Sequence, residues 1–243
     1  IASCLVGSEM CIRDRYSIVN GARRIKRLKH IQVNDLTVRQ RNRFKKEILL
    51  QDLKLTVRHG ENVSIFGRKK TETEALIDCL VGMKKPISGE ITIGKHTMTS
   101  LNEEEIADVR RNEIGIISAR VPLIQEYSVE RNLNINNLIS KKQKDIQEEL
   151  MPLFHYFNVE NKRKEKVQHL TTAEQETVRI IRALLAKPSI LMMEAPSHVD
   201  GLQKLIHYAW GRQLTFLYTT EDWERAKLAH GMLHLKDGRL YEG

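Results

Sequence analysis

Apolar and polar residues follow two kinds of pattern along the chain, and both predict strands. Residues 31–38 (IQVNDLTV) and 48–57 (ILLQDLKLTV) alternate, which is typical of strands with one buried face. Short runs that are almost entirely apolar predict strands buried on both faces of a parallel sheet, and they are 62–67 (NVSIFG), 189–194 (SILMME) and 214–220 (LTFLYTT). The final segment, MLHLKDGRLYEG, predicts a hairpin with Asp237-Gly238 at its turn.

Segments with helical spacing separate these strands. We expect helices at 75–83 (ALIDCLVGM), 103–112, 141–157 and 172–186. Between the first two, KKPISGEITIG reads as a turn followed by a strand. Strands that alternate with helices predict an α/β fold with a mostly parallel sheet covered on both faces, and a helical stretch inserted at about 100–170. No run of about 18 apolar residues occurs, so we expect no transmembrane helix.

The charge of the chain is concentrated near its start. The 243 residues are 41% hydrophobic, which is enough to form a core, and they carry a net charge of +9. Residues 1–46 hold 12 Lys/Arg against 3 Asp/Glu, whereas residues 47–243 hold 28 of each. The basic character therefore belongs to one edge, and the balanced body does not require a polyanionic partner.

The first 46 residues divide into parts with different interpretations. Residues 1–15 resemble a translated sequencing adapter, and we expect them to be non-native. Residues 16–30 predict a basic amphipathic segment, which is either a solvated linker or a contact with a membrane surface or nucleic acid.

Cys4, Cys11 and Cys79 are too few for a disulfide framework or a zinc site, which favours a reducing compartment.

The order of the segments resembles an ATP-binding cassette (ABC) nucleotide-binding domain over about 31–243. The resemblance rests on VSIFG with the helix after it, GMKKPISGEITIGKHTMTSL, HLTTAEQETVRIIRALLAKPSILMMEAP and DWERAKLAHGMLHLKDGRL. These sequence motifs are most similar to those of the lipoprotein-release, macrolide-export and cell-division type. The resemblance implies a P-loop NTPase-like fold with a mostly parallel sheet core, an antiparallel β subdomain and a helical subdomain at about 120–170.

The phosphate loop of this family is altered here. Such a loop needs glycines that turn backbone N–H groups toward the phosphates, a Lys that pairs with them and a hydroxyl for Mg²⁺. Its eight positions read Gly67, Arg68, Lys69, Lys70, Thr71, Glu72, Thr73 and Glu74. Only Gly67 matches, since Thr73 replaces the lysine and Glu74 the hydroxyl. A carboxylate about 4 Å from a phosphate oxygen costs roughly 4 kcal/mol at an effective dielectric near 20, although Lys69 and Lys70 could compensate in part.

The resemblance also locates the Walker B positions and the glutamine loop. Glu194 stands where the family has its magnesium-linked aspartate, and Ala195 where it has the general base, although a methyl group cannot accept a proton from water. The glutamine that reaches the metal falls at Ala119, and Asp200 remains in the loop after Walker B. We therefore assign no catalytic residue and no metal ligand, and the degenerate nucleotide-binding set is Gly67, Arg68, Lys69, Lys70, Thr71, Thr73 and Glu194.

Three further family positions have changed. The aromatic residue that stacks on adenine falls near Gln40, with Phe44 the nearest ring. The signature loop is LTTAE at 170–174, which lacks the two glycines, and the switch histidine falls at Glu221, or at Thr220 after a one-residue shift. An alignment slip or a sequencing error explains one such loss, but not losses at seven separately anchored positions.

These changes predict an ABC-type subunit of a membrane transporter that binds nucleotide weakly and has lost hydrolysis. The resemblance implies ATP and Mg²⁺ as cofactors, although we expect their binding to be impaired. It implies a transmembrane permease and a second cassette, identical or different, as partners, and a cytoplasmic position at the inner face of the membrane. Two alternatives stay open: a soluble pseudo-ATPase adaptor that binds protein or RNA through the basic arm at 23–46, and an active transporter ATPase with an atypical site. Nucleic acid is not the partner that we expect.

Overall fold

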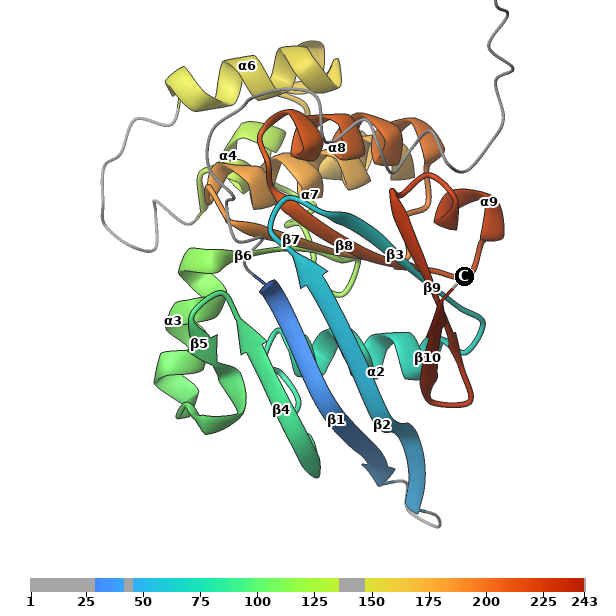
Figure 1. Ribbon diagram of the computed structural model, residues 1–243. Coiled ribbons are helices and arrows are strands. Elements are labelled where there is room, and N and C mark those ends of the chain that lie inside the picture. Colours follow the sequence, from blue (N-terminus) through green and yellow to red (C-terminus); the bar gives the residue numbers. More distant parts are fainter. Residues whose placement is uncertain (1–28, 42–45, 136–146, 243) are drawn as a thin grey trace, which may run out of the picture.

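The computed structural model describes residues 29–41, 46–135 and 147–242, and the strands within them form two sheets (Figure 1). One sheet is antiparallel in the order β2-β1-β4-β5, with β1 Lys29–Arg41, β2 Lys46–Arg58, β4 Ser88–Ile93 and β5 His96–Thr97. The other has the order β10-β9-β3-β8-β7-β6, with β3 Asn62–Gly67, β6 Ile114–Ile117, β7 Ile190–Glu194, β8 Thr215–Thr220, β9 Gly231–Lys236 and β10 Arg239–Glu242. All neighbours in this second sheet are parallel except β9 and β10. The predicted mostly parallel core and antiparallel sheet are therefore confirmed.

Seven α-helices are described, and most lie where the spacing predicts them. They are α2 Lys70–Leu80, α3 Glu103–Glu113, α4 Val129–Leu133, α6 Gln147–Phe157, α7 Thr172–Leu185, α8 Val199–Gly211 and α9 Trp223–Ala226. The segment 1–15, nearly all of 16–30 and the first part of the helix predicted at 141–157 lie outside the described residues. The apolar pattern missed the short strands β5 and β6 and the helices α8 and α9. In the described part of the chain, no helix combines the length and the apolar character needed to cross a membrane.

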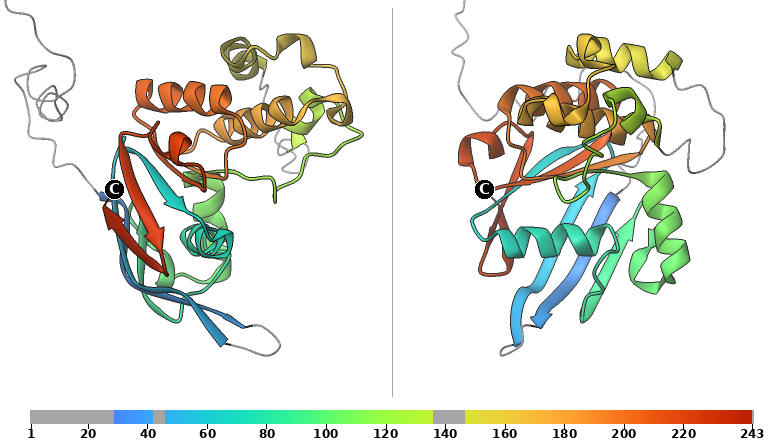
Figure 2. Two further views of the ribbon diagram at one scale, coloured as in Figure 1. Left: turned by 90° about the vertical axis from the view of Figure 1, so that its right-hand side faces the viewer. Right: turned by 180° about the vertical axis from the view of Figure 1, so that it is seen from behind.

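Helix α2 packs between the two sheets, while α7 and α8 cover the other face of the six-stranded sheet (Figure 2). Strand β7 illustrates the arrangement because its residues alternate between two cores. Ile190 and Met192 belong to the cluster that contains α2 and the antiparallel sheet, whereas Leu191 and Met193 belong to the cluster formed with α6, α7 and α8. The all-apolar pattern of this strand thus follows from burial on both faces.

Two hydrogen bonds tie the sheets together. The β9–β10 turn has φ of 50° at Asp237 and 75° at Gly238, which suits an Asp-Gly hairpin, and the N–H of Gln51 in β2 donates to the Gly238 carbonyl at 2.9 Å. In the second contact, Nδ1 of the buried His30 in β1 lies 2.6 Å from Oγ1 of Thr215 in β8. The pKa of His30 is lowered, first by burial and then by the neighbouring His59 ring, while Glu113 opposes the shift.

We expect the double-faced core to be sensitive to truncation at Met192. Met192→Ala should lower the free energy of unfolding by about 2–4 kcal/mol, because it deletes a fully buried side chain and leaves a cavity. The same change at Met83, which is 55% exposed, is the matched control and should cost less than about 0.5 kcal/mol. Urea denaturation measures both, and equal losses would contradict the packing described here.

The burial of His30 next to His59 should make stability depend on pH. Since the folded pKa of His30 lies below its ordinary value of 6.5, the folded state favours the neutral ring. This contribution is complete above pH 6.5 and is lost as the pH falls from there toward the folded pKa. We expect Tm to fall less between pH 7.5 and 5.5 in His30→Gln than in the unmodified chain. His96→Gln, on the partly exposed β5, is the control, and an unaltered pH profile in His30→Gln would refute the prediction.

Candidate functional site

Helix α2 begins at Lys70, inside the segment that the resemblance assigns to the phosphate loop. The N–H groups of Glu72 and Thr73 donate to the Lys69 carbonyl at 3.0 and 3.3 Å, so they are used within the first helical turn. The methyl group of Thr73 lies only 2.7 Å from the point that a Cβ at Gly67 would occupy. The segment after β3 is therefore a short turn into a helix, with Thr73 filling the space beside Gly67.

Two basic side chains of this segment pair with acidic neighbours. Lys69 Nζ lies 3.1 Å from Glu72 Oε1 and 3.2 Å from Asp237 Oδ1 in the β9–β10 turn. The hydrogen bond to Glu72, followed by that to Asp237, raises the pKa of Lys69. Lys70 Nζ lies 3.7 Å from Glu74 Oε1. These contacts direct both ammonium groups toward protein carboxylates.

The remaining candidates in the loop have different surroundings. Arg68 and Thr71 are exposed, and within the described part of the chain Arg68 forms no ion pair. Thr73 is buried, and its Oγ1 donates to the Lys70 carbonyl at 3.0 Å. Among the described residues, no hydrogen bond or ion pair joins Glu194 to the segment 67–74. The fold therefore brings the loop candidates together but leaves Glu194 with other partners.

Glu194, at the end of β7, is held by Ser118 and Arg120. The Ser118 hydroxyl donates to Glu194 Oε2, which also accepts from Arg120 Nε at 2.9 Å, and Arg120 Nη2 donates to Glu194 Oε1. The same guanidinium reaches helix α2, where Nη2 and Nη1 donate to Asp78 Oδ1 and Oδ2 at 2.8 and 3.2 Å. The bonds to Glu194, and then those to Asp78, raise the pKa of Arg120. Arg120 thus links α2 to β7.

Arg120, Ser118 and Asp78 are not predicted as site residues from the sequence. The signal available was position alone, because Ser118 and Arg120 flank Ala119, where the family has its glutamine. The backbone there is well fixed: the N–H of Arg120 donates to Ser118 Oγ at 3.0 Å, and Arg182 donates to the next two carbonyls, at Val121 and Pro122. Which carboxylates this arginine reaches depends on the packing of α2 against β7, which no local pattern specifies.

Ala195 follows Glu194 in a strained conformation. Its φ is 42°, in the left-handed region that costs a non-glycine residue about 1 kcal/mol or more, and its N–H donates to the Thr219 carbonyl at 2.9 Å. The adjoining switch positions are Thr220, buried at the end of β8, and the exposed Glu221. No group of three or more His, Cys, Asp and Glu side chains in the described ranges is placed to hold a metal ion.

The N-terminus of α7 carries the signature positions 170–174 and is capped by its own side chains. Thr171 Oγ1 accepts from the Glu174 N–H at 3.3 Å, while Glu174 Oε2 accepts from the Thr171 N–H at 2.8 Å. This capping box satisfies two backbone donors reciprocally. Lys162 lies 3.4 Å from Glu174 Oε1, and the pKa of Glu174 is lowered chiefly by the Thr171 N–H.

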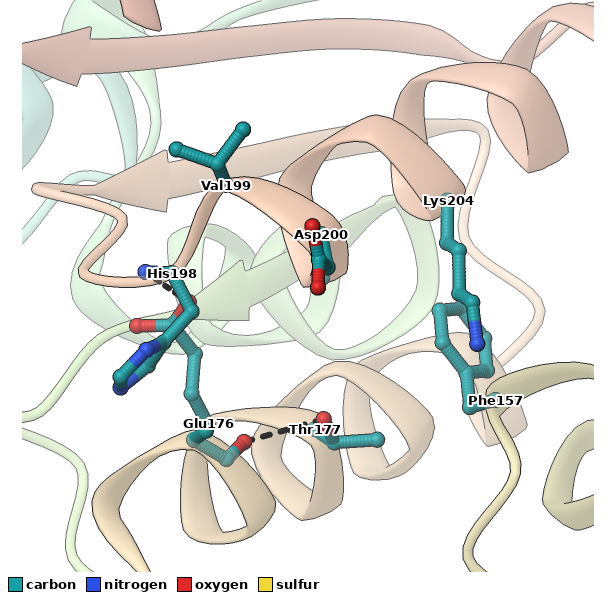
Figure 3. A pocket seen from close by; sticks show the side chains of 9 residues that line it. Phe157, Glu176, Thr177, His198, Val199, Asp200 and Lys204 are labelled. Carbon is teal, nitrogen blue, oxygen red and sulfur yellow. Dashed lines mark hydrogen bonds between the residues drawn. The ribbon is translucent and has the colours of Figure 1, made fainter.

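Near this helix, a hollow of about 280 Å³ lies between α6, α7 and the start of α8 (Figure 3). Asp200 lines it together with Glu176, His198 and Lys204. Glu176 is 7% exposed, and its carboxylate accepts from the N–H groups of Ser197 and His198 at 2.8 and 3.3 Å. The hollow includes neither Glu194 nor any residue of 67–74, so it is separate from the loop and Walker B positions.

Of Gln40 and Phe44, which the resemblance suggests for stacking on adenine, only Gln40 lies in the described part of the chain. Gln40 lies in β1 opposite Glu47 of β2 and is partly exposed, which gives no aromatic face for a base. Phe44, the nearest ring in the sequence, lies outside the described residues.

Comparisons with known proteins agree on one family. The family model described as ABC transporter matches residues 50–198. The lipoprotein-releasing system ATP-binding protein LolD of Buchnera aphidicola is 29% identical over 208 residues, which cover 82% of this chain and 91% of LolD. The methionine import ATP-binding protein MetN of Rhizobium johnstonii is 32% identical, over 83% of this chain and 58% of MetN.

Solved structures show the same fold. The dimeric ABC transporter cassette MJ0796 superposes with a TM-score of 0.77 at 21% identity, covering 87% of this chain and 98% of that one. The cassette cbiO1 of Clostridium perfringens gives a TM-score of 0.75 at 18% identity, over 88% and 87% of the two chains. Together with the family match over more than half of its length, this likeness shows that the chain belongs to the ABC transporter family and has the fold of its ATP-binding cassettes.

Proposed function

We propose that this chain is the cassette subunit of a membrane transporter that binds ATP weakly, does not hydrolyse it, and acts as a structural or regulatory partner. The observation that carries the proposal is the arrangement around α2, where protein side chains occupy the contacts that ATP and Mg²⁺ need. The framework around these positions is intact, since buried side chains form two hydrophobic cores.

The loop after β3 supports weak binding because it does not form a cradle. A cradle turns several consecutive N–H groups toward the phosphates, whereas here those of Glu72 and Thr73 bond to Lys69. The buried Glu72 places a carboxylate in the loop, and Lys69 is already paired with it. Arg68 is the remaining cation, and a single exposed arginine replaces neither the cradle nor the buried lysine.

The Walker B end of β7 supports the loss of hydrolysis. The Glu194 carboxylate already accepts three hydrogen bonds, two of them from the Arg120 guanidinium, whose positive charge would repel a metal ion at this position. Ala195 holds the position of the general base with a methyl group. The residues present therefore do not fit ATP with Mg²⁺, and no reaction step is derived through them.

The partners follow from the family and from one surface. We propose a transmembrane permease and a second, competent cassette as partners, with the chain at the cytoplasmic face of the membrane. The curated relatives include subunits named for lipoprotein release and for methionine import. In the predicted helical subdomain at about 120–170, α6 presents two large apolar side chains to solvent, Met151 at 41% and Tyr156 at 39% exposure, which suit a protein contact.

We expect equilibrium dialysis with Mg²⁺ and labelled ATP to give no saturable binding to the unmodified chain up to about 1 mM. A variant with a restored loop should bind at least tenfold more tightly, because it regains the flexible glycines, the lysine and the hydroxyl. Its substitutions are Lys70→Gly, Glu72→Gly, Thr73→Lys and Glu74→Ser.

The same preparations test hydrolysis. Neither the unmodified chain nor Ala195→Glu should release phosphate above a protein-free blank, since a base alone does not restore the loop. Turnover by the unmodified chain at the rate of an ordinary cassette, abolished by Glu194→Gln, would overturn the proposal and establish the atypical active ATPase instead.

For the partners, we expect the tagged chain to co-purify from solubilised membranes of its source with a multispan permease and a second cassette. Met151→Asp with Tyr156→Asp should reduce that recovery about tenfold or more, because it places charge in the proposed apolar contact. Ile48→Asp, at a 49% exposed apolar residue of β2, is the matched control and should leave it unchanged. Recovery of the chain without any membrane protein would contradict the transporter assignment.

A further inference from the structure

We propose that Arg120 is a built-in cation that joins α2 to β7 and holds the segment after β6 in place, so that this junction assembles without divalent metal or nucleotide. The inference rests on the proposed function, because that function takes Glu194 as the position where other cassettes hold a metal ion. It goes further by assigning Arg120 a positioning role that the sequence comparison does not give it.

The Arg120 guanidinium lies between two carboxylates, and its side chain is 43% exposed. All four carboxylate oxygens of Asp78 and Glu194 accept a hydrogen bond from the Arg120 guanidinium. The two carboxylates come from different elements, and their side chains are only 22% and 9% exposed. Without the guanidinium, two partly buried negative charges would face each other across the junction, and their repulsion would be stronger than at the surface.

Arginine suits this role better than lysine. Its planar fork presents several N–H groups that match two carboxylates at once, whereas the ammonium of lysine is a compact point charge. It also stays protonated at every physiological pH. A covalently attached cation is not removed by chelators, which separates this arrangement experimentally from a metal site.

The position of the junction gives it influence over two parts of the fold. Asp78 lies on α2 between Ile77 and Cys79, which belong to the core beneath the antiparallel sheet. Glu194 follows Met193, and the segment after Arg120 leads to Leu123 and Val129, all in the core formed by α4, α6, α7 and α8. Arg120 therefore fixes how the chain passes from the first core to the helices of the second.

The test uses thermal unfolding of the full chain without nucleotide, in EDTA and in 5 mM Mg²⁺ or Mn²⁺. We expect Tm of the unmodified chain to be the same in all three buffers. Arg120→Ala should lower Tm in EDTA by roughly 3–6 °C, and Mg²⁺ or Mn²⁺ should recover at least half of that loss, because Asp78, Glu194 and Ser118 then offer oxygen ligands to the ion.

Two variants control for unspecific effects of charge. Arg111→Ala removes an exposed arginine that pairs with Asp108, and its Tm should change little and not respond to the metal. Adding Asp78→Asn to Arg120→Ala should abolish the recovery by metal, since one carboxylate ligand is lost. A metal response in the unmodified chain, or an Arg120→Ala variant no less stable than Arg111→Ala, would overturn the inference.

Arg120→Lys keeps the charge and tests the inference if the alanine variant does not fold. Amide hydrogen exchange of residues 118–123 should be about tenfold faster in this variant than in the unmodified chain, because the ammonium cannot reach all four oxygens. Unchanged exchange would also overturn the inference. Since no nucleotide is present in either measurement, the outcome does not depend on whether the chain binds ATP, and the dialysis experiment judges that question separately.

Discussion

The packing of α2 between the two sheets is the constraint on which the site depends. This helix places its apolar side chains, including the fully buried Leu76 and Leu80, in the core shared by the antiparallel and parallel sheets. Its first turn is part of the loop segment 67–74. Farther along the helix, Ile77 packs in the core and the neighbouring Asp78 accepts hydrogen bonds from Arg120. The start of the helix at Lys70 therefore decides both the shape of the loop and the position of the Asp78 carboxylate.

Charged and polar side chains pair with other protein groups at three places, two of them beside α2 and one at the start of α7. Lys69 pairs with Glu72 and Asp237, and the Arg120 guanidinium binds two carboxylates. The capping box of α7 closes on itself through its own glutamate. Internal pairing of this kind is what the proposed function requires, because it satisfies these charged groups without phosphate or metal.

The proposed function and the role of Arg120 are consistent in physical terms. A subunit whose helices are set by its own side chains has no need of nucleotide to reach its folded arrangement. Such a subunit can present a constant surface to its partners while a second cassette supplies the chemical energy. Ala195 is one of seven non-glycine residues with positive φ in the described part of the chain, and its N–H ties the backbone after β7 to β8.

The apolar pattern by itself determined strands β3, β7 and β8 of the parallel sheet, the final hairpin and helices α2, α3 and α7, because burial on both faces and helical periodicity are local properties of the chain. It missed β6, a strand of only four residues in the same sheet. The amino-acid sequence also determined which residue types stand at the positions of the family's motifs, such as Thr73 and Ala195. Only the tertiary structure decided where α2 begins, that Lys69 turns to Glu72 and Asp237, and that Arg120 bridges Asp78 and Glu194. Apart from the local pair Lys69–Glu72, these contacts join residues 42 to 168 positions apart, and such pairings depend on how the sheets and helices pack rather than on any local pattern.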